Sequence, residues 1–147
     1  MNPPVTIESL TARLVRNHFT NWMGLEILRA GDGEIEILAP WREEFVSNPD
    51  RRFTHGGILA ALIDTAGSFA VATRLGRPPQ TVDMRVDYHR AAMPGPLTVT
   101  GSIVRFGRTL ATSDAFVYDA KKVLLTSGRA VFLTGEGSPA PSQDSSS

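Results

Sequence analysis

The segment FTHGGILAALIDTAGSFAVA, residues 53–72, opens on His-Gly-Gly and holds a single acid, Asp64, within a largely apolar run. The run continues to Arg74, after which Gly76 and two prolines follow. Glycine and proline at these positions stop a helix, so the segment predicts one long helix over residues 57–74. Apolar side chains lie on nearly every side of that helix, and we therefore expect other elements to cover it.

The second half of the chain has the pattern of strands. From Val82 to Tyr88, apolar and charged residues alternate, which is typical of a strand with one face toward water. Three more apolar-rich runs follow at residues 96–106, 109–119 and 122–134, separated by short turns. Together these runs predict a four-strand antiparallel meander.

The first half predicts smaller elements. Residues 6–19 place their apolar side chains on one helical stripe and predict an amphipathic helix. Residues 23–40 hold two apolar-rich runs around Ala-Gly-Asp-Gly and predict a β-hairpin that turns at residues 31–33. Residues 41–53 contain Asn-Pro and no sustained period, which predicts a loop with at most one helical turn. The sum is an α+β fold with the long helix packed on a curved antiparallel sheet.

Length and composition limit the number of domains and the class of partner. A chain of 147 residues, 41% of them hydrophobic, closes one core, so we expect a single domain over residues 1–135. Residues 136–147, dominated by Ser, Pro and Gly, predict a disordered tail. Fifteen basic residues balance fifteen acidic ones, so no overall field attracts nucleic acid.

Cysteine usage and the N-terminus bear on the compartment. The absence of cysteine excludes disulfides, thiolate metal sites and cysteine nucleophiles. The first ten residues lack a signal-peptide pattern, and by inspection no apolar run approaches the ~20 residues of a membrane helix. We therefore expect a cytoplasmic protein without a membrane partner.

One face of the long helix carries the candidate chemistry. That face holds Gly57, Ala61, Asp64 and Ser68, and it is the face of the helix with the smallest side chains. A buried carboxylate needs a donor or a proton, since leaving it unpaired costs several kcal/mol. The amides of Gly56 and Gly57 begin the helix at the positive end of its dipole, where they could form an oxyanion hole. The alternatives are an acid that is merely solvated and a Gly-Gly pair that only lets the chain turn.

Distance separates these two features. Gly56 and Asp64 are eight residues apart, or ~12 Å along a helix, which is too far for both to act on one carbonyl. If two copies pack their long helices antiparallel about a two-fold axis, Asp64 of one chain can face the helix N-terminus of the other. The spacing therefore predicts an active site at a dimer interface, present twice.

The stretches HGGILAALIDTAGSFA and TVDMRVDYHRAAMPGPLTVTGSIVRFGRTLATSDAFVYD resemble the hotdog-fold acyl-CoA thioesterases, in particular the phenylacetyl-CoA thioesterase-like branch. The resemblance covers roughly residues 24–134 and includes the spacing from His-Gly-Gly to Asp64. It implies a hotdog fold, in which the sheet wraps the long helix, and a dimer that joins two sheets edge to edge, often within a tetramer. It also implies an acyl-CoA substrate, with no metal and no cofactor beyond the CoA of the substrate.

Carried over by position, the resemblance implies that the Gly56 amide polarises the thioester carbonyl while Asp64 attacks it or activates a water. His55 would orient the thioester or a water, or else cap the helix. The family has an Asn about six residues before this His; here Asn48 stands seven before it and could equally be a turn residue. Thr81 matches a hydroxyl position that can hold the attacking water, although Thr is also an ordinary strand residue.

The resemblance further implies where CoA binds. Arginines and a histidine near strand ends would bind its phosphates, assisted by neighbouring glycines and hydroxyls. The residues implied are Gly57, Tyr88, His89, Arg90, Arg105, Gly107, Arg108 and Thr109.

Three functions fit the sequence. The first is hydrolysis of a small or medium acyl-CoA, aryl or aliphatic, to the free acid and CoA. The second is a non-catalytic acyl-CoA-binding hotdog module that acts as a sensor or assembly unit. The third, a dehydratase or hydratase, ranks lowest because His55 is followed by Gly-Gly and not by the Phe-Pro common in acyl-carrier dehydratases.

Overall fold

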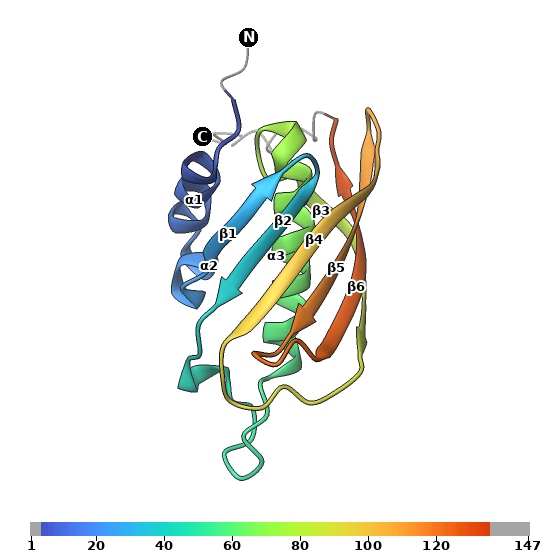
Figure 1. The fold of residues 1–147 in the computed structure, drawn as a ribbon. Helices are drawn as coiled ribbons and strands as arrows, with labels where there is room; N and C mark the ends of the chain where they lie inside the picture. Colours follow the sequence, from blue (N-terminus) through green and yellow to red (C-terminus); the bar gives the residue numbers. More distant parts are fainter. Residues whose placement is uncertain (1–3, 136–147) are drawn as a thin grey trace, which may run out of the picture.

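The computed structural model describes residues 4–135 and shows a six-stranded antiparallel sheet curved around one long helix (Figure 1). The helices are α1 (Ile7–Arg16), α2 (His18–Met23), the single 3₁₀ turn η1 (Glu43–Phe45) and α3 (Gly56–Leu75). The strands are β1 (Glu26–Gly31), β2 (Glu34–Ala39), β3 (Gln80–Tyr88), β4 (Leu97–Phe106), β5 (Leu110–Tyr118) and β6 (Leu124–Leu133). The predicted α+β hotdog architecture is confirmed, while the tail predicted for residues 136–147 lies outside the described residues.

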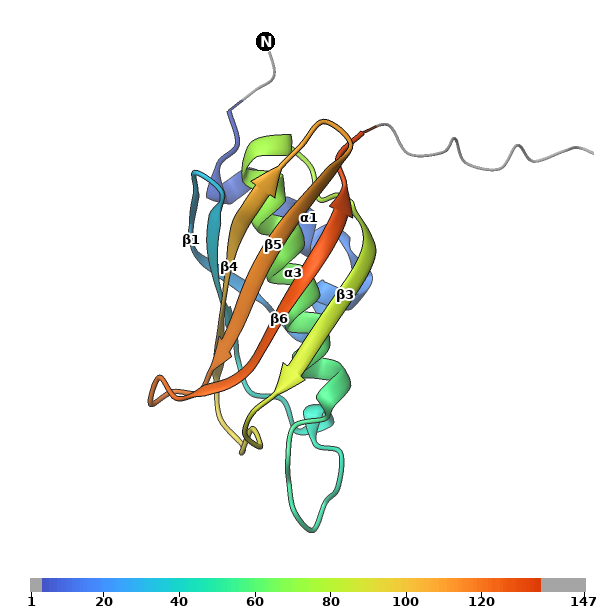
Figure 2. The ribbon, with the colours of Figure 1, turned by 90° about the vertical axis from the view of Figure 1, so that its right-hand side faces the viewer.

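The long helix forms the centre of the core. It begins at Gly56, one residue before the predicted start, and Gly76 ends it in a left-handed conformation with φ 87°. Most of its buried apolar side chains belong to one core cluster with those of the strands. Figure 2 shows the helix lying behind β4, β5 and β6. Glycine permits this close packing, because a Cβ on Gly101 of β4 would overlap the carbonyl group of Ala66. A Cβ on Gly67 would lie 3.1 Å from the ring of Phe132.

The length and composition of α3 correct one expectation from the sequence. The sequence predicted no apolar run that approaches the length of a membrane helix. This was wrong, because by length and composition α3 could cross a membrane. In the structure, however, 61% of its most apolar window is buried inside the protein. The helix is therefore apolar because it fills the core.

Strand pairing corrects the predicted meander. Strands β4, β5 and β6 follow one another, but β3 pairs with β6 and not with β4, so the sheet order is β1-β2-β4-β5-β6-β3. The segment 89–96 carries the chain past the N-terminal end of α3 to the middle of the sheet, where β4 pairs with β2 and β5 (Figure 1). Alternation predicts strands but not their partners, and both edges of β4 are taken by β2 and β5. As a result, β3 is an edge strand with one side free of hydrogen bonds to other strands.

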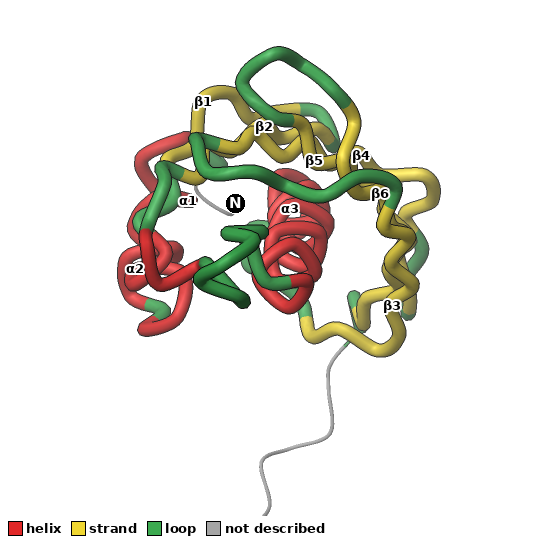
Figure 3. The backbone as a smooth tube through the Cα atoms, turned by 90° about the horizontal axis from the view of Figure 1, so that it is seen from below, coloured by secondary structure: helices red, strands yellow, loops and turns green. Residues whose placement is uncertain are grey.

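The predicted N-terminal helix is two helices. Asn17 ends α1 in an extended conformation, and its Oδ1 accepts hydrogen bonds from the amides of Phe19 and Thr20 at 3.0 and 3.1 Å. Asn17 is thus the N-cap of α2. Figure 3 shows α1 and α2 on one side of α3 and β3 on the other. The predicted β1–β2 hairpin is confirmed, with Asp32 and Gly33 at φ 53° and 82° in its turn.

Candidate active site

Asp64 meets Thr81 within one chain. Asp64 lies half-buried on the side of α3, and Thr81 is the second residue of β3, which runs beside the helix. The Thr81 hydroxyl donates a hydrogen bond of 2.7 Å to Oδ1 of Asp64. The Asp64 side chain makes no other hydrogen bond within residues 4–135. Oδ2 is therefore available to a water or a substrate.

The Asp64–Thr81 pair opens into a cavity of about 410 Å³, here called the Asp64 cavity. The helices α1 and α2 form one wall, α3 the floor, and the chain before β3 the other wall. Its lining residues are Arg13, Asn17, Phe19, Thr20, Ala61, Asp64, Thr65, Ser68, Phe69, Pro78, Pro79 and Thr81. The sequence singled out Asp64, Thr81, Ala61 and Ser68, but not the wall from α1 and α2, whose only sequence signal was an amphipathic stripe.

His55 is the N-cap of α3. Its Nδ1 accepts a 2.8 Å hydrogen bond from the amide of Gly57, which requires that nitrogen to be unprotonated and leaves the proton of a neutral ring on Nε2. A Cβ on Gly57 would lie 2.9 Å from that nitrogen, so the glycine makes room for the cap. Of the two predicted roles for His55, the structure shows the cap. It also shows that the amide of Gly57 already has a partner.

The amide of Gly56 has no such partner. It donates no hydrogen bond to any atom of residues 4–135, and it belongs to the first residue of α3. The carbonyl of Gly56 accepts a 2.7 Å hydrogen bond from the Tyr88 hydroxyl at the far end of β3. A free amide at the positive end of a 20-residue helix is suited to bind a carbonyl oxygen that gains negative charge.

A second cavity, of about 360 Å³, surrounds this helix start and is here called the Gly56 cavity. Its lining residues are Ser47, Phe53, Thr54, Gly56, Leu59, Tyr88, His89, Arg90, Ala91 and Ala92. It shares no residue with the Asp64 cavity. The structure therefore brings Tyr88, His89 and Arg90 together with Gly56, and Nε2 of His89 lies 2.7 Å from the Ser127 hydroxyl.

The other predicted CoA contacts lie at the opposite end of the molecule. Arg105, Gly107, Arg108 and Thr109 form the end of β4 and the turn into β5, drawn at the top of Figure 1, whereas α3 begins near the bottom. The hydroxyl of Thr134 donates a 2.6 Å hydrogen bond to the Gly107 carbonyl. Because Thr134 follows the residue that pairs with Gln80, this turn is adjacent to the start of β3, where Thr81 lies.

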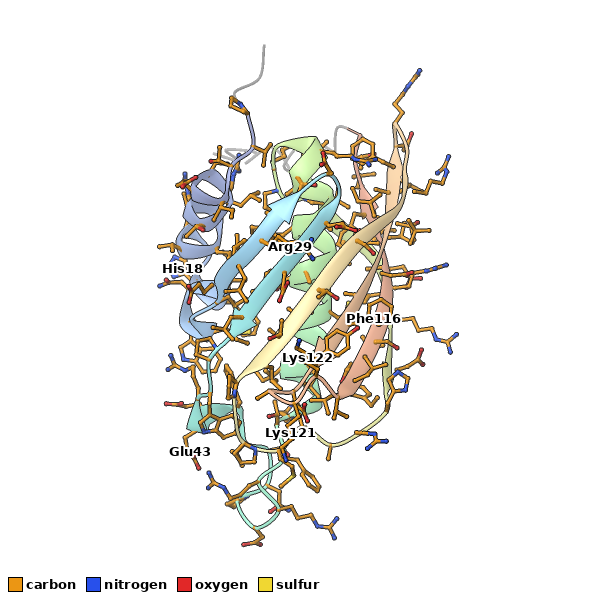
Figure 4. All side chains as sticks on the ribbon, in the orientation of Figure 1. His18, Arg29, Glu43, Phe116, Lys121 and Lys122 are labelled. Carbon is orange, nitrogen blue, oxygen red and sulfur yellow. The ribbon has the colours of Figure 1, made fainter. Side chains whose placement is uncertain are left out.

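Asn48 lies apart from both cavities in the loop after η1. Its Oδ1 accepts a 2.8 Å hydrogen bond from the amide of Asp50 and so closes a local turn. The same loop is tied to η1 by Arg52, which donates to both carboxylate oxygens of Glu43 at 2.6 and 2.8 Å. This hydrogen bond lowers the pKa of Glu43 and raises that of Arg52. Glu43 lies at the lower end of the molecule in Figure 4, the end at which α3 begins.

A metal centre needs several ligands close together. Within residues 4–135 there is no group of three or more His, Asp or Glu side chains that could hold a metal ion.

Comparison with known proteins gives the family. The family model described as the thioesterase superfamily matches residues 52–126, which include the start of α3, Asp64 and Thr81. The chain belongs to the thioesterase superfamily. A Halobacterium salinarum protein is 34% identical over 123 residues that cover 76% of this chain and 81% of the relative.

Solved structures of this superfamily agree with the fold. A thioesterase-superfamily protein solved by a structural genomics consortium superposes with a TM-score of 0.84 at 46% identity, covering 86% of this chain and 96% of its own. The phenylacetic acid degradation protein PaaI of Thermus thermophilus, solved as a point mutant, has a TM-score of 0.71 at 25% identity and covers 80% and 98%. The Escherichia coli medium/long-chain acyl-CoA thioesterase YigI is 24% identical, with 80% of this chain and 85% of the relative covered. These matches confirm the resemblance to the phenylacetyl-CoA thioesterase-like branch.

Proposed function

We propose that the protein hydrolyses acyl-CoA thioesters to the free acid and CoA, at sites that two chains build together. The observation that carries this proposal is the separation of the Gly56 amide from Asp64 into two cavities that share no residue. Eight residues of helix place them ~12 Å apart, so a single chain offers either the oxyanion donor or the acid, but not both at one carbonyl.

In the proposed reaction, the thioester carbonyl oxygen accepts a hydrogen bond from the Gly56 amide, which stabilises the negative charge of the tetrahedral intermediate. Asp64 removes a proton from a water, and the resulting hydroxide adds to the carbonyl carbon. The C–S bond then breaks, and CoA leaves as a thiolate that takes up the proton. Alternatively, Asp64 itself attacks, CoA leaves, and water cleaves the mixed anhydride. In both routes Thr81 holds Oδ1 and orients Oδ2.

The free edge of β3 supports the two-chain arrangement. If β3 pairs with its own copy in antiparallel fashion, the start of one strand lies beside the end of the other. Thr81 and Asp64 of one subunit would then approach Tyr88 and Gly56 of the second. The same pairing would bring the turn at residues 105–109 of one subunit toward His89 and Arg90 of the other. The CoA contacts that lie apart within one chain would thus meet at one site.

Mixing two inactive variants tests this proposal. Asp64→Asn removes the acid, and Gly56→Pro removes the amide hydrogen while placing proline at the first helical position, which proline favours. The residue before it, His55, has φ −58° and ψ 134°, a conformation compatible with a following proline. Each variant alone should lose about 10²–10³-fold in kcat on an acyl-CoA.

The mixture gives the decisive result. After the two variants are unfolded and refolded together in equal amounts, half of the dimers are mixed and each has one intact site, so about a quarter of the wild-type activity should return. Separately refolded variants are the control. Folded dimers that recover no activity on mixing, or a single variant that keeps the wild-type rate, would contradict the proposal.

The second candidate is the acyl-CoA-binding module without catalysis. It is favoured by Asn48, whose side-chain oxygen is engaged in its own turn and lines neither cavity. CoA release measured with a thiol reagent over aryl- and alkyl-CoA thioesters separates the two candidates, because a binding module would bind acyl-CoA without releasing thiol. We also propose that the protein is a homodimer, that two dimers pair into a tetramer, and that it is cytoplasmic.

A further inference from the structure

The Asp64 cavity contains polar groups that the proposed hydrolysis does not use. Ser68 lies one helical turn beyond Asp64 and is only 9% exposed. Its hydroxyl makes no hydrogen bond within residues 4–135, although it lines the cavity. The other hydroxyls on this wall are engaged: Thr65 donates to the Ala61 carbonyl and Thr20 to the Leu14 carbonyl. Ser68 is therefore a nearly buried hydroxyl that needs a partner from a ligand or a water.

Arg13 borders the same cavity from α1. It is exposed, and its guanidinium forms no ion pair or hydrogen bond with the side chains of residues 4–135. Asn17 lies one turn further along the chain; its Oδ1 caps α2, which leaves its NH₂ group as a donor. Apart from Asp64 the cavity lining contains no other acid. Beyond the Asp64–Thr81 pair, the available polar groups are thus two donors and a hydroxyl.

An unsubstituted fatty acyl chain in this cavity would displace water from the Ser68 hydroxyl without offering it a partner, and it would gain nothing from the charge of Arg13. Resting on the proposed function, we infer that the preferred acyl group carries an oxygen acceptor at its far end, and that this acceptor is a carboxylate. Arg13 and Ser68 are the residues that would select it. The carboxylate follows from Arg13, because an anionic acceptor gains more from the charge of the guanidinium than a neutral one does. The mixed lining also contains apolar contacts for the carbons in between, from Phe19, Phe69 and Pro79.

Three CoA thioesters of equal chain length test this inference. Hexanoyl-CoA ends in a methyl group, 6-hydroxyhexanoyl-CoA in a hydroxyl, and adipoyl-CoA in a carboxylate. For the wild type, kcat/KM should be highest for adipoyl-CoA, by roughly three- to tenfold over hexanoyl-CoA, since a charged hydrogen bond at an exposed arginine contributes modestly. The hydroxyl compound should lie between them.

Two variants assign the selectivity. Arg13→Gln should remove the preference for adipoyl-CoA, so that the ratio of the kcat/KM values for adipoyl-CoA and hexanoyl-CoA falls to about one. Arg16→Gln, which removes the same charge from α1 at a residue that does not line the cavity, is the control and should keep the preference. Ser68→Ala should lower the rates on adipoyl-CoA and 6-hydroxyhexanoyl-CoA by about threefold relative to hexanoyl-CoA. The melting temperature should not change, because this hydroxyl has no partner within the described chain.

The outcomes separate this inference from the proposed function. If no CoA thioester is hydrolysed, the proposed function fails and the inference with it. If hexanoyl-CoA is hydrolysed as fast as or faster than adipoyl-CoA, hydrolysis stands and the carboxylate preference is wrong. If adipoyl-CoA is preferred equally by wild type and Arg13→Gln, the selecting residue is not Arg13.

Discussion

The Asp64 cavity and the Gly56 cavity lie against the same helix, yet they present different chemistry. In the first, side chains act: a carboxylate held by Thr81, with Ser68 and Arg13 nearby. In the second, the group that the proposed reaction uses is a backbone amide at the start of α3, which has no hydrogen-bond partner within residues 4–135. A side chain can be replaced by substitution, whereas an amide is removed only by proline.

This difference explains the residue types at the two places. The Asp64 half depends on which side chains are present. The Gly56 half depends on side chains being absent, because a Cβ on Gly57 would displace the imidazole of His55 from its cap. The comparison teaches that, in the proposed reaction, two glycines without functional side chains are as necessary as the acid.

Among the substitutions that test the difference between the two cavities, a change at Thr81 should lower the activity most. Thr81→Val keeps the shape of the side chain but removes the donor to Oδ1 of Asp64. Hydrogen bonds to charged groups contribute about 1.5–3 kcal/mol, so kcat should fall roughly 10- to 100-fold while KM stays near its wild-type value. Steady-state kinetics on one acyl-CoA measures this. Thr81→Ser, which keeps the hydroxyl, should retain most of the activity, and an equal loss in both variants would argue against the hydrogen bond.

A smaller effect is expected at the cap of α3. His55→Ala should destabilise the fold by about 1 kcal/mol, because the Gly57 amide loses its acceptor. Gly57→Ala should do the same through the clash with Nδ1. His55→Asn restores a capping oxygen and should recover the melting temperature, which thermal unfolding monitored by circular dichroism would show. If His55→Asn is as stable as wild type but loses activity, His55 acts on the substrate as well as on the helix.

The smallest effect is expected where His89 contacts Ser127. Ser127→Ala frees the His89 ring from its 2.7 Å partner and should raise KM for acyl-CoA about two- to threefold, with kcat unchanged. Lys121→Ala, a change in the exposed β5–β6 turn that lines neither cavity, is the matched control and should leave KM at its wild-type value. A fall in kcat without a change in KM would contradict a role of the Gly56 cavity in CoA binding.

Much of the fold could be predicted because its signals are local. The apolar run ending at Gly76 predicts α3, the alternation from Val82 predicts β3, and Ala-Gly-Asp-Gly predicts the first hairpin. The partner of β3 could not be predicted, since an alternating strand carries no record of the strand beside it. The break at Asn17 was also missed, because an N-cap within an amphipathic stripe leaves the apolar spacing unchanged.

The candidate site was predicted in part for the same reason. Helical spacing places Asp64 and Ser68 on one face, and the structure shows both lining one cavity. The hydrogen bond from Thr81 could not be derived from spacing, because it joins residues 17 positions apart in different elements. The wall formed by Arg13 and Phe19 had no chemical signature in the sequence at all.

The sequence by itself determined a helix that starts on two glycines and carries one acid two turns later. Those are properties of neighbouring residues, and backbone geometry converts them directly into positions along an axis. Only the structure decided that His55 caps the Gly57 amide, that the Gly56 amide has no partner among the described residues, and that Asp64 opens into a cavity walled by α1 and α2. The cavity wall arises from contacts between segments distant in the chain, which packing selects and residue spacing does not encode. The cap joins residues only two positions apart, and the structure decided which of the two predicted roles His55 takes.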